Sequence, residues 1–289
     1  MTFIIGCGYV GRRVAAALHL RGEPVTGIVR TADSAKAVAA LGVAWLRLDL
    51  EHDAFDVLPC AGERVFHFAP PPGPGDEDPT MARLLEAFDR TGHPRRLVYI
   101  STTGVYGDCE GAWVDESWPA RPVAERALRR WHAEQQLRRW SRDSGAELVI
   151  LRVAGIYACD RLPLARIRDA QPVVSMDEAP WSNRIHVDDL AKVCLTAMDR
   201  APAGALYNVC DGSPSTMTDY FCRVADAAGL PRPPQIPLAD APGRVSAGML
   251  SYLRESRRLS NRRMCDELGI QLRFPTLADG LDDCFPAKG

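Results

Sequence analysis

The sequence has no hydrophobic run long enough to cross a membrane and no strong excess of charge of either sign. Its 289 residues include 35 basic and 37 acidic side chains. No stretch approaches the roughly 20 apolar residues that a membrane-spanning helix requires. The start of the chain also lacks the basic-then-apolar layout of a secretory signal peptide. We therefore expect a cytoplasmic protein with no membrane partner, and the balanced charge does not favour nucleic-acid binding.

Cysteine pairs with a recognisable spacing are also missing. The nine cysteines are odd in number, contain no C-x-x-C and are scattered along the chain: Cys7, Cys60, Cys109, Cys159, Cys194, Cys210, Cys222, Cys265 and Cys284. The six histidines are dispersed as well. This pattern favours reduced thiols over disulfides, and it gives no support to a metal site.

What the sequence does contain is a glycine-rich turn near its first residue. A short apolar run at 2–5 leads directly into G-C-G-Y-V-G at 6–11. A helical pattern follows at once, with Val10, Val14 and Leu18 spaced four residues apart. A G-x-G-x-x-G motif between a strand and a helix indicates a dinucleotide-binding site.

Each glycine of this motif has a separate physical purpose. Gly6 permits the tight turn, Gly8 lets the backbone approach a pyrophosphate, and Gly11 lets the helix pack closely on the strand. The pyrophosphate would lie on the free N–H groups at the start of the helix, around Tyr9 and Val10.

The end of the second predicted strand, at 24–29, indicates which dinucleotide is bound. An NAD site usually has an acidic residue there for the ribose hydroxyl. Here the strand ends in Arg30, and no acid occurs until Asp33. A guanidinium suits a 2′-phosphate, and Arg12 and Arg13 can add to it. We therefore expect NADP rather than NAD; the alternative is that Arg30 is only a solvated strand end.

Strand and helix patterns alternate through the first half of the chain. Further strands are predicted at 44–48, 64–69, 96–101 and 147–152, and helices at 80–90 and 121–140. This alternation predicts an α/β fold with a Rossmann-type, doubly wound parallel sheet. Ligands of such sheets bind at the carboxyl ends of the strands.

The regular alternation breaks down towards the C-terminus, where a proline-rich run occupies 231–242. We therefore expect a dinucleotide-binding domain over 1–157, which also takes in about 183–211. The remaining residues, 158–289, are expected to form mainly a smaller substrate-capping region.

Several later motifs, taken with the glycine turn, resemble the extended and atypical branch of the short-chain dehydrogenase/reductase superfamily, the NAD-dependent epimerase/dehydratase group. Each motif alone is too loose to identify a family. Together, in this order along nearly the whole chain, the motifs are specific to this one. They are D-L at 49–50, H-F-A-P at 67–70, S-T-T-G-V-Y-G-D at 101–108, D-E-S at 115–117, L-R-V-A-G-I-Y at 151–157, N-R-I-H-V-D-D-L at 183–190 and Y-N-V at 207–209.

The resemblance implies a nicotinamide cofactor at the carboxyl edge of the sheet. It places Asp49 and Leu50 near the adenine, and Ala69 and Pro70 along the cofactor. Ser101 completes this predicted set.

The resemblance also assigns a residue to the reacting oxygen of the substrate. In the family a Ser or Thr four residues before the Tyr of V-Y-G hydrogen-bonds this oxygen, and that position is Thr102 here. Thr103 is its neighbour on the substrate side. The alternative for Thr102 is a β-branched residue that only closes a strand.

The family's catalytic pair, Tyr-x-x-x-Lys, is missing from its usual place. The Glu that follows the pair in the family matches Glu134, so the Lys position holds Arg130 and the Tyr position holds Arg126. A guanidinium has no lone pair to accept a proton, so Arg126 cannot act as the general base. Arg130 can still hold the ribose and supply positive charge.

Three interpretations of the two arginines remain open. They lie on one helix face, which is either a solvated basic face or a clamp for an anionic substrate. In the third, the proton donor has moved elsewhere, and Tyr106 is the best candidate because it lies beside Thr102. Tyr157, His186 and the acids 188–189 are further candidates, although the two acids fit a helix N-cap better.

The substrate side is expected to include Asn183, Arg184, His186 and Tyr157. The leading hypothesis is an oxidoreductase, epimerase or dehydratase that transfers hydride between the nicotinamide and a carbon bearing a hydroxyl or carbonyl. The resemblance alone implies a nucleotide sugar as the substrate. The alternative is an inactive NADP(H) sensor. Family members often form homodimers through two helices, and 121–140 is a candidate for one of them.

Overall fold

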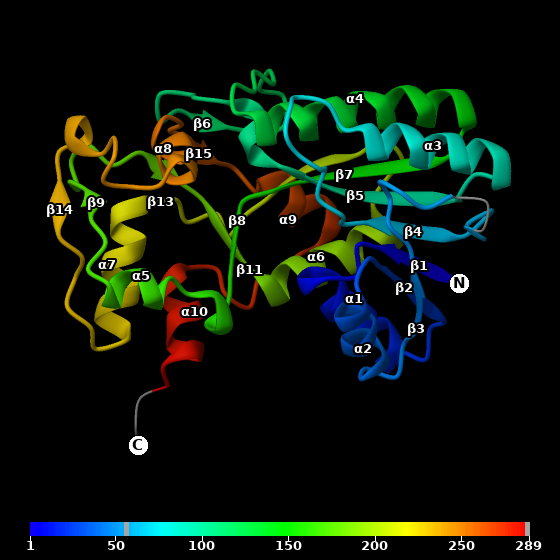
Figure 1. The fold of residues 1–289 in the computed structure, drawn as a ribbon, viewed down its shortest axis with the longest axis horizontal. Helices are drawn as coiled ribbons and strands as arrows, with labels where there is room; N and C mark the ends of the chain where they lie inside the picture. Colours follow the sequence, from blue (N-terminus) through cyan, green and yellow to red (C-terminus); the bar gives the residue numbers. More distant parts are fainter. Residues whose placement is uncertain (55–57, 287–289) are drawn as a thin grey trace. The chain divides into compact units, whose positions relative to one another are not determined.

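The computed structural model describes residues 1–54 and 58–286, and the chain divides into two compact units (Figure 1). Unit 1 comprises Met1–Val105, Pro122–Arg152 and Leu190–Tyr207; unit 2 comprises Tyr106–Arg121, Val153–Asp189 and Asn208–Gly289. The predicted dinucleotide-binding domain, 1–157 with about 183–211, differs from unit 1, because 106–121, 153–157, 183–189 and 208–211 are grouped with unit 2.

The large sheet of the chain has seven strands. They are β1 (Thr2–Ile5), β2 (Val25–Val29), β3 (Ala44–Arg47), β4 (Arg64–His67), β5 (Arg96–Thr102), β7 (Glu147–Val153) and β12 (Leu206–Val209). Their spatial order is β3-β2-β1-β4-β5-β7-β12. The pairings from β3 through β5 are all parallel. The doubly wound sheet expected from the sequence is therefore confirmed.

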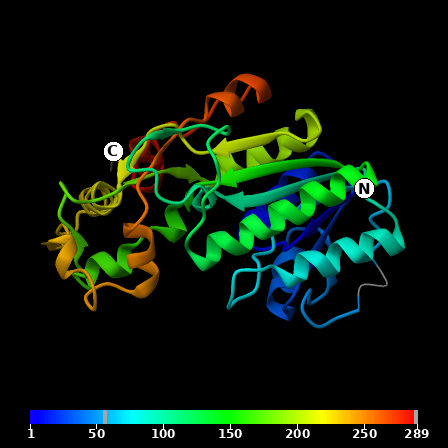
Figure 2. The same ribbon diagram turned by 90° about the horizontal axis from the view of Figure 1, so that it is seen from above.

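Helices cover both faces of this sheet. They are α1 (Tyr9–Leu20), α2 (Ala32–Ala39), α3 (Pro79–Thr91), α4 (Glu125–Ser144) and α6 (Val187–Arg200). Helices α3 and α4 lie side by side on one face, and α1, α2 and α6 lie on the other (Figures 1 and 2). Helix α4 begins later than the predicted 121–140, because Arg121 precedes Pro122 and a proline disfavours helical backbone at the residue before it.

One apolar core of unit 1 lies between the sheet and the α3–α4 layer. Ile5 of β1, Phe88 of α3 and Leu137 of α4 are fully buried in one apolar cluster. Helix α3 starts at this layer because Asp78 caps it, accepting hydrogen bonds from the N–H groups of Thr80 and Met81. This packing holds α3 and α4 against the sheet.

Unit 2 is assembled from short elements. Its described residues contain four two-stranded sheets. These pair β6 (Trp113–Val114) with β15 (Arg258–Leu259), β8 (Gly155–Tyr157) with β11 (Arg184–His186), β9 (Val173–Val174) with β14 (Gln235–Ile236), and β10 (Trp181–Ser182) with β13 (Ser215–Thr216). The short helices are η1 (Thr103–Tyr106), which begins in unit 1, η2 (Cys159–Arg161), α5 (Leu164–Arg168), α7 (Met217–Ala227), η3 (Leu238–Asp240), α8 (Ala247–Leu253), α9 (Arg262–Leu268) and α10 (Leu277–Cys284).

The expectation that all cysteines are reduced is wrong for one pair. Cys159 and Cys284 form a disulfide, with their Cα atoms 4.9 Å apart. They are 125 residues apart in sequence, so spacing could not reveal the pairing. The other seven cysteines are free thiols, and all but Cys265 are buried.

The helices in the described part of the chain include none that is long and apolar enough to span a membrane.

Candidate functional site

The carboxyl ends of β1 and β4 lie next to each other, at the point where the strand order reverses direction. Gly6 follows β1 with a φ of 79°, in the left-handed region that favours glycine. A Cβ at Gly6 would lie 2.4 Å from the backbone nitrogen of Ala69, which follows β4. Open α/β sheets bind ligands at such a switch point. The first glycine therefore serves both the turn and the approach of the two strand ends.

The other two glycines behave as the motif predicts. A Cβ at Gly11 would lie 3.1 Å from the Ile4 side chain, so α1 packs closely on β1 only without one. At Gly8 the nearest atom to such a Cβ is 3.9 Å away, and this atom is the Gly6 oxygen. Among the described residues, no side chain caps the α1 N-terminus. The loop thus leaves room and N–H groups for an anionic ligand such as a pyrophosphate.

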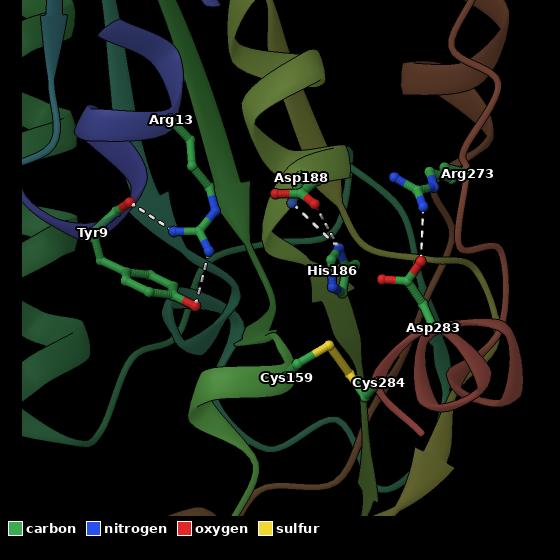
Figure 3. Close-up of a disulfide and its surroundings, with 8 residues drawn as sticks. All are labelled: Tyr9, Arg13, Cys159, His186, Asp188, Arg273, Asp283 and Cys284. Carbon is green, nitrogen blue, oxygen red and sulfur yellow. Dashed lines mark hydrogen bonds and ion pairs between the residues drawn. A yellow bond between two sulfur atoms is a disulfide. The ribbon is translucent and has the colours of Figure 1, made fainter. Parts of the chain in front are cut away.

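Tyr9 and Arg13 are bound to each other along α1 (Figure 3). The Arg13 guanidinium donates to the Tyr9 carbonyl and hydroxyl oxygens, both at 3.3 Å, and lies 4.2 Å from the Tyr9 ring centre. Arg13 is therefore engaged within the helix, which does not favour its expected contribution to a 2′-phosphate site.

Arg30 lies at the end of β2 with two thirds of its side chain exposed. Its described ion-pair partner is Glu51, at 3.6 Å, and Glu51 is itself exposed. Such surface pairs contribute little free energy, so Arg30 can exchange this partner for another anion. Asp49, predicted near the adenine, accepts a hydrogen bond from the Glu51 N–H, which with nearby His52 and Arg30 lowers the Asp49 pKa.

Arg130 joins the ends of β4 and β5. Its guanidinium donates to the carbonyl oxygens of Ile100, at 2.8 Å, and Ala69, at 3.3 Å, and to the Tyr99 hydroxyl, at 3.2 Å. The residue at the family's Lys position therefore fixes the backbone along which the cofactor is expected. Whether it also holds the ribose remains a prediction.

The Ser101 hydroxyl has a hydrogen-bond partner within the protein, Glu134, which the sequence did not reveal. The hydroxyl donates to Glu134 at 2.5 Å. Glu134 also accepts from Arg152 at 2.8 Å and forms an ion pair with Arg138 at 3.1 Å. Glu134 is fully buried, and Arg152 nearly so. This network binds α4 to β5 and β7, and it occupies the Ser101 hydroxyl, which is predicted to lie at the cofactor.

Thr102 ends β5 and is only half-buried. Its hydroxyl accepts the N–H of Gly104 at 3.2 Å, which shapes the turn that follows. A Cβ at Gly104 would lie 3.4 Å from the Ala127 side chain, so the first turn of α4 packs next to this turn. Half-buried Arg126 belongs to the same helical turn. Thr102 and the family's Tyr position therefore come from adjoining segments.

The structure does not favour Tyr106 as a proton donor. Its side chain is fully buried in unit 2, and its hydroxyl donates to Asn208 at 2.7 Å. A general acid must reach the substrate, and this phenol is instead committed to the interior.

The predicted substrate residues of unit 2 are brought together but are buried. Tyr157 and His186 pair edge to face, with ring centres 5.2 Å apart. The Asn183 amide donates to the Arg257 carbonyl, and its oxygen accepts the Leu259 N–H. Arg184 donates to Ser182 and Ser215. These are internal partners, which the burial of this cluster explains.

The two acids at 188–189 lie in the first turn of α6 rather than at its N-cap. The Asp188 N–H instead donates to the ring of His186 at 3.3 Å. Asp189 accepts the N–H groups of Arg273 and Phe274, at 2.8 and 2.9 Å. Asp189 therefore anchors a C-terminal segment, a contact that no local sequence pattern reveals.

A doubly wound parallel sheet with a glycine turn at its switch point defines the Rossmann class of fold. Within that class, the chain belongs to the NAD dependent epimerase/dehydratase family, whose sequence model matches residues 2–210.

Individual relatives cover most of the chain. Protein YeeZ of Escherichia coli (strain K12) is 28% identical over 284 residues, which span 94% of this chain and 95% of that protein. A 4-hydroxy-2-methyl-3-oxo-4-farnesyl-3,4-dihydroquinoline-1-oxide ketoreductase of Stigmatella aurantiaca is 28% identical over 249 residues, which span 79% of this chain and 73% of that protein.

Solved structures share the whole fold. A functionally unknown conserved protein from Silicibacter pomeroyi DSS has a TM-score of 0.85 at 32% identity, covering 98% of this chain and 97% of that one. MoeE5, solved in complex with UDP-glucose and NAD, has a TM-score of 0.77 at 21% identity, covering 97% and 95%.

Proposed function

We propose that unit 1 binds a nicotinamide dinucleotide and that the protein catalyses hydride transfer to or from a carbon of a small molecule that bears a hydroxyl or carbonyl. The observation that supports this most is the glycine turn, with open space at Gly8 and an α1 N-terminus that no described side chain caps. The family to which the chain belongs is described as NAD dependent, which supports a nicotinamide cofactor.

We infer that the cofactor is NADP. Arg30 follows β2, where a dinucleotide's 2′ substituent is recognised, and its partner Glu51 is a weakly held surface carboxylate. A 2′-phosphate would displace Glu51 and gain a charge-assisted, bidentate contact. The hydroxyls of Thr31 and Ser34, 2.9 Å apart at the start of α2, add donors beside it.

The bound nicotinamide would supply or accept the hydride, and the chain's own residues orient the reacting carbon and stabilise charge. The Thr102 hydroxyl would donate to the reacting oxygen. Arg126 would stabilise the charge that develops there, because a guanidinium cannot exchange the proton at neutral pH. Arg130 would keep the ends of β4 and β5 in place beneath the cofactor.

Two substrate classes have support among the relatives. MoeE5 was solved with UDP-glucose, and the Stigmatella aurantiaca relative is named as a ketoreductase. A reductase needs only one proton transfer per turnover, which solvent can supply, whereas reversible epimerisation needs a residue that takes and returns protons. With Arg126 and Arg130 in place of the Tyr and Lys, we favour reduction of a ketone.

The first test is a titration with NADPH and NADH, followed by nicotinamide fluorescence. We expect NADPH to bind more tightly, and Arg30→Asp to weaken NADPH by about 10-fold or more while leaving NADH nearly unchanged. Arg90→Asp, on the last turn of α3, is the matched charge reversal and should change neither. If the wild type binds neither cofactor, the proposed function fails.

The sensor alternative is tested by turnover. A panel of ketones and UDP-sugars is incubated with NADPH and followed at the nicotinamide absorbance. We expect Thr102→Ala to reduce kcat about 100-fold and Thr102→Ser to restore most of it. Tight NADPH binding without turnover of any panel member would favour the sensor.

A further inference from the structure

The Cys159–Cys284 disulfide fastens the end of α10 to η2, the short helix that follows β8 (Figure 3). Both cysteines belong to unit 2. Cys159 is exposed and Cys284 is half-exposed, whereas six of the seven free cysteines are buried. Small thiols and disulfides in solution can therefore reach this pair in preference to most other cysteines of the protein.

Helix α10 closes over Tyr157. A Cβ at Gly280 would lie 2.1 Å from the Tyr157 hydroxyl oxygen, so the helix contacts the ring only because position 280 is glycine. Leu277 and Leu281 are buried in the same apolar cluster as Tyr157. Among the described residues the Tyr157 hydroxyl has no hydrogen-bond partner, and it is covered by this helix.

The segment before α10 is held separately from the disulfide. Asp189 accepts the N–H groups of Arg273 and Phe274, and the Phe274 ring lies 4.0 Å from the ring of His186. Position 274 therefore stays anchored when the disulfide opens. The ten residues from 275 to 284 are therefore held at their start by the Asp189 contacts, in either redox state, and at their end by the disulfide.

Besides the disulfide, the far end of α10 is held by Leu281 and Phe285, which pack in the Tyr157 cluster, and by few polar contacts. The helix is eight residues long, and isolated helices shorter than about 12 residues are marginal in water. A capping box of Thr276 and Asp279 supports its first turn. Its last turn has one further described polar contact, the exposed ion pair of Asp283 with Arg273 at 2.7 Å. Such exposed pairs add little.

We propose that Cys159 and Cys284 form a redox-active pair, a site of thiol–disulfide exchange that latches α10 over the Tyr157 hydroxyl when oxidised and releases it when reduced. Tyr157 and His186 lie on the substrate side expected from the sequence. The latch would therefore regulate access to that face, although its existence does not depend on the proposed activity.

The chemistry of the latch balances with a low-molecular-weight disulfide, such as oxidised glutathione, as the oxidant. One cysteine thiolate attacks this disulfide and forms a mixed disulfide, which releases one small thiol. The second cysteine attacks the mixed disulfide, the Cys159–Cys284 bond forms and a second small thiol leaves. Two electrons pass from the protein to the oxidant, and a small dithiol reverses the exchange.

The first experiment counts thiols after incubation with oxidised glutathione or dithiothreitol. Each sample is alkylated in denaturant, so that the buried thiols also react. With nine cysteines in the chain, we expect seven alkylated cysteines in the oxidised protein and nine in the reduced one, with a cross-linked peptide from the oxidised protein that contains Cys159 and Cys284. Nine reactive thiols in the oxidised sample, or a different cross-linked pair, would overturn the proposal. This count requires neither cofactor nor substrate.

The second experiment measures hydrogen exchange of the backbone in both redox states. Reduction should speed exchange at least 10-fold in 277–284 and leave 273–274 protected by Asp189. Cys284→Ser and Cys159→Ser should exchange at the reduced rate in both states, while Cys265→Ser, which changes a partly exposed free thiol, should behave like the wild type. Equal exchange of 277–284 in the oxidised and reduced wild type would show that the bond is no latch.

Discussion

Gly6 lies so close to Ala69 that a Cβ on residue 6 would be 2.4 Å from the Ala69 nitrogen and 2.6 Å from its Cα. The clash would be with backbone, which cannot move aside as a flexible side chain can. This contact joins the loop after β1 to the loop after β4, and these loops border the switch point of the sheet. The first glycine of the motif is thus required by the protein itself as well as by its ligand.

The roles of Gly6 in stability and of Gly8 in cofactor binding can be distinguished by experiment. Gly6→Ala should lower the free energy of unfolding by about 2–3 kcal/mol, because the new Cβ meets backbone at a positive φ. Gly8→Ala, which has space for its Cβ, should change stability by less than about 1 kcal/mol and still weaken NADPH binding. Urea unfolding and cofactor titration of the same two variants check this. Equal destabilisation by both would contradict the assignment of Gly6 to the turn.

The sequence predicted the sheet well because its signals are local. Alternating strands and helices, the glycine turn and the apolar spacing in α1 all lie within short windows, and β1, β2, β4, β5 and β7 appear where expected. The helix predicted at 121–140 was displaced at both ends, since α4 runs from Glu125 to Ser144.

Contacts between distant residues could not be predicted in this way. Its position beside Thr102 made Tyr106 the best candidate for the proton donor. In the fold, however, the Tyr106 hydroxyl points towards Asn208. The Cys159–Cys284 bond and the contact of Asp189 with Phe274 join segments that no spacing rule connects. Candidate residues on the substrate side therefore need the fold before they can be given a role.

Glu134 should be more important for stability than its place on an arginine-rich helix suggests. Glu134→Gln removes the buried carboxylate charge that pairs with the Arg152 guanidinium, and we expect a loss of about 3 kcal/mol or more. Arg138→Gln removes the half-exposed partner of the same carboxylate and should cost less than about 1 kcal/mol. Chemical denaturation of both variants at neutral pH gives the comparison; similar losses would argue against a buried network.

His67 should make the protein less stable in mild acid. Burial lowers its pKa to about 4; Asp78 opposes this shift and Arg130 adds to it. Because the unfolded chain binds a proton near pH 6.5 and the folded one does not, this contribution to stability is complete above pH 6.5. It is lost as the pH falls towards 4.

The loss from His67 is on the order of 3 kcal/mol for a shift of this size. His67→Phe keeps a ring beside Tyr99, and it should flatten the dependence of the urea midpoint on pH between 4 and 6.5. His93→Gln is the control, since His93 is a surface residue paired with Asp89. An unchanged pH profile in His67→Phe would mean that another group causes the acid sensitivity.

Asp211 should have the opposite effect on the alkaline side. Burial raises its pKa to about 7, although the Ser213 N–H and the nearby Arg184 guanidinium favour its charged form. The folded protein therefore holds a proton that the unfolded chain has already lost. The stability that this proton contributes is full below about pH 4 and disappears as the pH rises through 7.

Asp211→Asn replaces the protonated carboxyl with a neutral group of similar shape, which cannot ionise. Relative to wild type, we expect this variant to become progressively more stable between pH 5 and pH 8, as measured by thermal unfolding at several pH values. Asp226→Asn supplies a control of opposite sign, because hydrogen bonds from Arg232 lower the pKa of Asp226 and its charged form is the one that the fold stabilises. If Asp211→Asn instead loses stability most strongly at pH 8, the Asp211 carboxylate is charged in the folded protein and its pairing with Arg184 outweighs the effect of burial.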